Sequence, residues 1–191
     1  GGTIEAHQKN MTRDLARRLA CPAVLARYSR LFLDYNRYPG AWDCLRPDLG
    51  GVPVPGNLGI DAAELARREA IARAPLDAAI AARLPGRRAL VSVHSFTPQL
   101  HGQPRLVEIG VLWRSDRRLA EPLLARLRQA DRYIVGDNAH YDWHAAEAYS
   151  LQHHALDQGL PCVYLEVRND LLLAPGGVEE IAALLAPILA E

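Results

Sequence analysis

The feature of this sequence that most constrains its fold is the alternation of short apolar runs with longer segments of helical periodicity. Residues 89–93 and 162–167 are runs of the length and composition of buried central strands. Around them, apolar residues recur at three- and four-residue spacing, as on the buried face of a helix. This alternation predicts an α/β fold with a mainly parallel or mixed central sheet and helices on both faces.

The ends of the predicted elements follow from local signals. Asp61 stands three residues before Glu64, a pattern that begins a helix, and this helix should end near Pro85. The sequence shows no internal repeat and no linker, so we expect a single domain over residues 1–191. We expect further helices at 10–20, 119–127, 143–156 and 178–189, and further strands at 24–35, 105–113 and 133–135.

The charge of the chain excludes two classes of partner. With 22 Lys and Arg and 22 Asp and Glu, the formal net charge is zero, which gives no broad attraction to nucleic acid or to anionic lipid. The sequence contains no apolar run long enough to span a bilayer, and we expect neither membrane insertion nor secretion. Cys21, Cys44 and Cys162 have no CxxC spacing, which argues against a disulfide framework. We therefore expect a cytoplasmic protein that binds a small molecule, with neither nucleic acid nor membrane as partner.

His94 stands where a predicted strand ends. It follows the apolar residues 90–93 and precedes Pro98, so its imidazole could point into a crevice at the carboxyl end of the sheet. This position suits a zinc ligand. The alternative is a structural histidine that bonds a neighbouring backbone group. A serine hydrolase that uses Ser92 or Ser95 is less suited to the sequence, since neither lies in a GxSxG turn.

Glu166 belongs to the late apolar strand. It alternates with Leu165 and Val167, and it therefore shares a face with Tyr164 and Arg168. A carboxylate beside zinc is the usual group for taking a proton from bound water. The alternative is an ion pair on a solvated edge strand, because an exposed strand face alternates in the same way.

Arg30, Asn36 and Arg37 surround an apolar run at residues 31–33. Burying two guanidinium groups beside such a run is costly unless anions partner them. Asp34 could be one such anion, which would make the arrangement purely structural. A substrate with two carboxylates could supply the other.

Six short segments of the chain carry a family resemblance, and it extends over nearly the whole chain. They are residues 28–31 (YSRL), 34–37 (DYNR), 54–57 (VPGN), 94–98 (HSFTP), 136–138 (GDN) with Tyr141, and 165–170 (LEVRND). In this order they resemble the N-formylglutamate amidohydrolase family, part of a wider group of zinc carboxypeptidase-like and aspartoacylase-like hydrolases.

The resemblance implies roles for particular residues. It implies that His94 binds zinc, that Glu166 is the general base and that Arg30 stabilises the oxyanion. Asn36 and Arg37 would grip a substrate carboxylate.

Further residues are candidates for substrate binding. Arg105 and Asn138 could hold a second carboxylate, and Tyr141 belongs to a matched segment. His154 aligns with a histidine common in the family, the alternative being a helix-face histidine that packs on the sheet. His144 begins an HxxE spacing, but the family's first zinc ligands precede the segment of Arg30, so we interpret this spacing as chance.

The chain departs from the family pattern at its start. Family members carry an HxG-type motif that donates the first zinc histidine, followed by an acidic ligand, and nothing upstream of Arg30 spells that motif. Glu5 falls roughly where the family has its acidic residue. Ala139 and His140 stand where the family often has Glu-Pro. A catalytic zinc takes about three protein ligands, so we expect a domain that lacks an N-terminal strand and has an incomplete ligand set.

The resemblance implies a zinc-dependent amidohydrolase that releases formate from N-formyl-L-glutamate or a similar N-acylated acidic amino acid. One alternative is a metal-free protein of the same fold that binds small dicarboxylates and performs no chemistry. Another keeps the zinc but acts on a different acylated amino acid.

Overall fold

The computed structural model describes residues 4–144 and 148–191. Its centre is a mixed four-stranded sheet with the strand order β3-β8-β6-β7. β3 is parallel to β8, β6 is parallel to β7, and β8 and β6 are antiparallel. The expected mixed sheet flanked by helices is thus confirmed, with β8 as an interior strand. The bounds of the strands are β3 Leu90–Phe96, β6 Ile109–Leu112, β7 Val135–Asp137 and β8 Cys162–Arg168.

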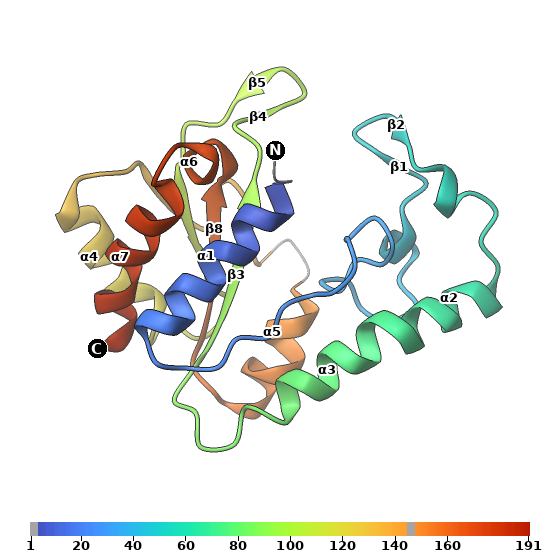
Figure 1. Cartoon of the computed structure of the whole chain (residues 1–191), viewed down its shortest axis with the longest axis horizontal. Helices are drawn as coiled ribbons and strands as arrows, with labels where there is room; N and C mark the ends of the chain where they lie inside the picture. Colours follow the sequence, from blue (N-terminus) through green and yellow to red (C-terminus); the bar gives the residue numbers. More distant parts are fainter. Residues whose placement is uncertain (1–3, 145–147) are drawn as a thin grey trace.

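Helices cover the sheet, and two small hairpins lie outside it, β4-β5 directly after β3 and β1-β2 on the side of α2 (Figure 1). Figure 1 shows α1 and α7 together at one side of the sheet, with the helix formed by α2 and α3 at the other side of the molecule. None of the described helices is both long and apolar enough to cross a bilayer. The helices are α1 Ile4–Arg18, α2 Ala62–Arg68, α3 Ala74–Ala81, α4 Ala120–Ala130, α5 Tyr149–His154, α6 Asn169–Leu173 and α7 Gly177–Ala190, with the shorter η1 Trp42–Leu45, η2 Pro55–Asn57, η3 Glu69–Arg73 and η4 Leu156–Gln158. The hairpins pair β1 Asp48–Leu49 with β2 Val52–Pro53 and β4 Gln99–Leu100 with β5 Gln103–Pro104.

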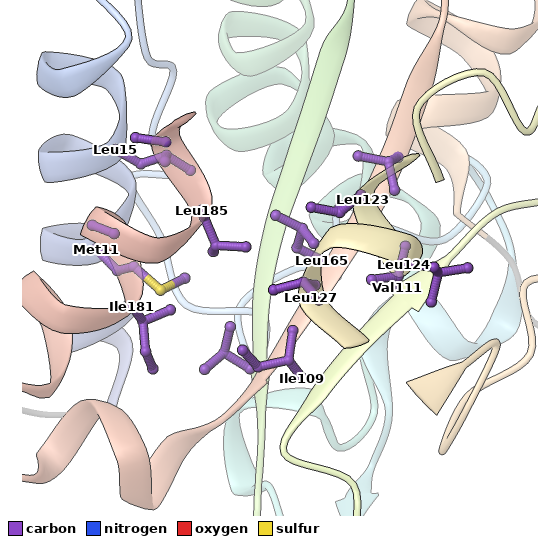
Figure 2. Packing of buried hydrophobic residues seen from close by; sticks show 14 of the residues in the cluster. Met11, Leu15, Ile109, Val111, Leu123, Leu124, Leu127, Leu165, Ile181 and Leu185 are labelled. Atoms are coloured by element: carbon purple, nitrogen blue, oxygen red, sulfur yellow. The ribbon is translucent and has the colours of Figure 1, made fainter. Parts of the chain in front are cut away.

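The alternation of side chains along β8 divides the interior into two parts. Val163, Leu165 and Val167 join the main core, which α1, α4 and α7 cover. Figure 2 shows residues of this core, among them Met11 of α1, Leu165 of β8 and Ile181 of α7. Tyr164 belongs to a second cluster, which also contains Leu151 of α5. Glu166 shares the face of Tyr164, since side chains two apart on a strand point the same way.

The main core should carry most of the stability. Ile181 in α7 is fully buried within it. We expect Ile181→Ala to lower the free energy of unfolding by about 2–5 kcal/mol, because the lost methyl groups leave a cavity. Urea unfolding measures this, with Leu173→Ala as the control because Leu173 is 48% exposed. Equal losses in the two variants would contradict this description of the core.

The strand expected at residues 24–35 is wrong. This segment is a series of turns outside the sheet, although Leu33 and Tyr35 are buried in a third cluster. Arg68 donates to the carbonyl of Phe32, and Arg73 donates to the carbonyls of Asp34 and Tyr35. Side chains thus satisfy backbone groups that a neighbouring strand would otherwise pair.

Several expected boundaries also shift. The strand expected at 105–113 is β6, which begins only at Ile109, so Arg105 lies in the connection from β5. The helix expected at 143–156 is α5, which begins at Tyr149, and residues 145–147 of that expectation lie outside the described residues. The strand expected at 133–135 is β7, two residues later.

Candidate active site

His94 and Glu166 lie on the same face of the sheet. In the parallel pair of β3 and β8, His94 is opposite Glu166 and Ser92 is opposite Tyr164. Residues opposite each other in a pleated sheet point to the same face. The His94 ring also stacks on the Tyr164 ring, with 4.2 Å between centroids and 12° between planes. The imidazole and the carboxylate therefore lie together. We call them, with the residues that contact them, the Glu166 cluster; its members are Arg30, Asn36, His94, Arg105, Tyr141, Tyr164 and Glu166.

Glu166 is a buried carboxyl group on an interior strand, so the alternative of a solvated edge strand is wrong. Its side chain is only 7% exposed, and burial raises its pKa to about 7. A hydrogen bond with Tyr164 and the positive charges of Arg30 and Arg105 act in the opposite direction. Its Oε2 atom has no hydrogen-bond partner among the described residues. Glu166 can therefore exchange a proton near neutral pH.

A glycine in the strand beside Glu166 makes room for the carbonyl group of Ala139. Gly110 of β6 stands opposite it, and a Cβ atom there would lie 3.4 Å from the Glu166 Cβ and 2.7 Å from the carbonyl oxygen of Ala139. A larger residue at position 110 would therefore displace the Ala139 backbone.

Arg105 places a second charge in the cluster. It is only 6% exposed, and its guanidinium contacts two neighbouring rings, 5.5 Å from the centroid of Phe96 and 5.0 Å from that of Tyr141. Arg168 donates to the Arg105 carbonyl at 3.2 Å and fixes the backbone. The Nη1 atom of Arg105 has no hydrogen-bond partner within the described part of the chain. A buried guanidinium with an unused donor is suited to bind a carboxylate.

The loop before η1 contributes polar groups from the other side of the cluster. Arg30 Nη2 lies 2.6 Å from Asp34 Oδ2, and the backbone N–H of Asn36 donates to Asp34 Oδ1. Asn36 Nδ2 then donates to the Tyr164 hydroxyl at 3.1 Å. Burial by itself would lower the pKa of Arg30, but the charge of the buried Asp34 outweighs this effect and raises that pKa. Asp34 is thus its internal anion.

The surroundings of His94 keep its imidazole neutral. Burial lowers its pKa to about 4, and the nearby positive charge of Arg30 adds to this effect. Its Nε2 atom lies 3.0 Å from the Ser92 hydroxyl. A neutral imidazole is the form that binds metals.

Three of the predicted substrate-binding residues have partners of their own. Arg37 forms an ion pair with Asp43, with 2.6 Å between Nε and Oδ2. The Oδ1 atom of Asn138 accepts from the backbone N–H of Trp113. His154 is buried, and its Nε2 atom lies 2.9 Å from Asp77 Oδ1, which joins α5 to α3. The structure therefore connects Arg30, Asn36, His94, Arg105, Tyr141 and Glu166, and gives Arg37, Asn138 and His154 separate contacts.

Tyr164 is a member of the Glu166 cluster that the sequence did not single out as a candidate site residue. It contacts His94 by stacking, Asn36 by a hydrogen bond and Glu166 by a second hydrogen bond. Its position two residues before Glu166 on a strand is the signal that could have found it.

The donor set for zinc is incomplete in the described part of the chain. A catalytic zinc takes about three protein ligands and one open position. Residues 4–144 and 148–191 contain no group of three His, Cys, Asp or Glu side chains that could hold a metal ion. His94 and Glu166 supply one imidazole and one carboxylate, so the described residues by themselves do not form a zinc site.

An open mixed sheet with a buried carboxyl group and a buried arginine on one face is a hydrolase-like α/β fold. A comparison with known families matches residues 4–173 to the N-formylglutamate amidohydrolase family, and the chain belongs to this family. Among solved structures, the gene product Atu2144 of Agrobacterium tumefaciens is similar, with a TM-score of 0.88 and 33% sequence identity. The alignment covers 94% of this chain and 73% of that one. A comparison with curated proteins gave no match.

Proposed function

We propose that this protein is an amidohydrolase that removes the formyl group from N-formyl-L-glutamate or a similar N-acylated acidic amino acid. The family supports an amide-cleaving role. The observation that carries the proposal is the pairing of two buried groups with unused hydrogen-bonding atoms, Glu166 Oε2 and Arg105 Nη1, in one cluster. The first suits proton transfer and the second suits binding of a substrate carboxylate.

Each of three residues of the Glu166 cluster has its own role in the proposed reaction. Glu166 takes a proton from water as the water oxygen bonds to the amide carbonyl carbon. Arg30 stabilises the negative charge that forms on the carbonyl oxygen. Glu166 then gives the proton to the amide nitrogen, the C–N bond breaks, and formate and the free amino acid leave. Arg105 holds a carboxylate of the substrate throughout.

Zinc dependence with His94 as one ligand stays a prediction. Zinc would supply a Lewis acid for the carbonyl and a water of lowered pKa. The described donors do not complete a zinc site, so the proposed roles of Glu166, Arg30 and Arg105 do not depend on the metal. Elemental analysis of the purified protein tests this prediction, since one zinc per chain would support it and a metal-free, active protein would contradict it.

The second candidate is a binding protein for small dicarboxylates that performs no chemistry. The observation that favours it is the combination of an anion-binding arginine with an incomplete metal donor set in the described residues. Calorimetry with L-glutamate separates the candidates, because this function requires binding without any turnover of the formylated compound.

A substrate panel with a chelator control tests the proposed function. We expect formate release from N-formyl-L-glutamate with kcat/KM about 100-fold above that for N-formyl-L-glutamine, which lacks the side-chain charge. If zinc takes part, a chelator should abolish the release and added zinc should restore it. Absence of formate at micromolar enzyme with zinc supplied would contradict the proposal.

The Tyr164 hydroxyl should contribute to turnover through Asn36 and Glu166. We expect Tyr164→Phe to lower kcat/KM about tenfold, as the loss of one hydrogen bond to a charged group does. The matched control is Tyr133→Phe, because the Tyr133 hydroxyl also bonds a glutamate, Glu180, at 2.8 Å on the surface. Equal activity in the two variants would show that the Tyr164 hydroxyl has no part in the site.

A further inference from the structure

The long helix beside the Glu166 cluster contains a π-helical turn. η3 spans Glu69–Arg73, and the backbone N–H of Ala74 donates to the carbonyl of Glu69, five residues earlier. In an α-helix, residues five apart are rotated by about 140° from each other. The wider turn of a π-helix brings such residues toward one face. Arg68 and Arg73 are five residues apart, and both side chains bind the loop at residues 27–37.

The two arginines are anchored in the same way. Each is buried and pairs with a glutamate four residues earlier, Arg68 with Glu64 and Arg73 with Glu69. Their remaining donors then point away from the helix. Such a planar, multiply bonded guanidinium loses little freedom when it binds backbone carbonyls.

Arg68 and Arg73 hold different parts of the loop. Arg68 donates to the carbonyls of Phe32 and Gly56 and to the side chain of Asn57. Arg73 donates from Nη1 to the Tyr35 carbonyl at 2.8 Å and from Nη2 to the Asp34 carbonyl at 3.1 Å. Arg73 therefore binds the backbone of Asp34 and Tyr35, which lies between Arg30 and Asn36, the two loop residues assigned to the site.

The loop depends on such side-chain contacts because residues 27–37 belong to no helix or strand. Residues 27–37 are turns and extended segments without a strand partner. Within them, the Asp34 carboxylate fixes Arg30 and the backbone of Asn36, and Asn36 reaches Tyr164. Ser150 also donates to the Tyr35 carbonyl, but at 3.4 Å. A shift of the Asp34 backbone would move both Arg30 and Asn36 relative to Glu166.

We propose that Arg73 is a positioning residue, which sets the place of Arg30 and Asn36 in the site by clamping the Asp34 and Tyr35 carbonyls from the π-helical turn. This role rests on the proposed amidohydrolase function. Arg73 also contacts the Tyr149 ring and the Cys44 thiol, and in the proposed role it acts through the loop carbonyls and not on the substrate. A misplacement of about 1 Å in a catalytic group can cost about 100-fold in rate.

The test compares Arg73→Gln with Leu185→Ala, a fully buried change in the main core that leaves the loop contacts intact. We expect both variants to lose thermal stability. At a temperature where both are folded, Arg73→Gln should lose about 100-fold in kcat/KM for N-formyl-L-glutamate, mainly in kcat, while Leu185→Ala stays within about threefold of the wild type. Arg73→Lys should lose about tenfold, since an ammonium keeps the charge but not the fork that spans two carbonyls.

Amide hydrogen exchange gives a readout that does not depend on turnover. Arg73→Gln should exchange faster than Leu185→Ala specifically at residues 28–37. Equal exchange there, full activity of Arg73→Gln, or full rescue by lysine would overturn the proposal. A wild-type protein without turnover would contradict the proposed function, whereas faster exchange confined to residues 28–37 would still support the hold of Arg73 on the loop.

Discussion

Glu166→Gln should make the protein more stable at pH 8, by about 3 kcal/mol in the free energy of unfolding. Burial raises the pKa of Glu166 from 4.5 to about 7, so above pH 7 the folded protein contains an ionised carboxyl group in an unfavourable place. Below pH 4.5 the group is protonated in both the folded and the unfolded chain. The stability that the raised pKa provides is complete there and is lost as the pH rises to about 7. Glutamine mimics the protonated form at every pH.

Urea unfolding of both proteins at pH 8 and pH 4.5 measures this effect. The gain should be present at pH 8 and absent at pH 4.5. Glu179→Gln is the control, since Glu179 is exposed and should change the free energy by less than about 0.5 kcal/mol at either pH. A variant less stable than the wild type at pH 8 would mean that ionised Glu166 does not destabilise the folded protein. This result would contradict a raised pKa for Glu166 and its assignment to proton transfer.

Arg105→Gln should raise KM for N-formyl-L-glutamate about 100-fold with little change in kcat. The buried guanidinium would lose its charge and with it the hold on the substrate carboxylate. The change also removes the guanidinium from the Phe96 and Tyr141 rings, so thermal unfolding should first show that the variant is folded at the assay temperature. Steady-state kinetics measures the change.

Two comparisons make the Arg105 experiment specific. Activity on N-formyl-L-glutamine, which lacks the side-chain carboxylate, should change less if Arg105 binds that group. Arg132→Gln serves as the control variant, because Arg132 pairs with Glu180 on the exposed surface. An unchanged KM in Arg105→Gln would refute the assignment of this residue to substrate binding.

The sequence predicted the parts of the fold that local patterns determine. The apolar run at 162–167 is β8, and the amphipathic segment at 178–189 is α7, because burial on one face leaves a clear period in the sequence. The register that places His94 opposite Glu166 comes from the structure, because the sequence associated the two residues only through the family resemblance.

The loop of Arg30 could not be predicted in the same way. Its apolar residues 31–33 have the composition of a strand, but Arg68 binds the Phe32 carbonyl and Arg73 binds the carbonyls of Asp34 and Tyr35. Both arginines lie more than 30 residues later in the chain. No local pattern reveals such a long-range contact. The separate partners of Arg37, Asn138 and His154 are of the same kind, since Asp43, Trp113 and Asp77 meet them only in the folded chain.

The most direct test of the account is formate release from N-formyl-L-glutamate by the wild type and by Glu166→Gln, measured at pH 8 with zinc supplied. We predict turnover by the wild type and a rate about 1,000-fold lower in the variant, since the loss removes the group that transfers the proton. Equal rates in the two folded proteins would contradict the assignment of Glu166 as the catalytic base.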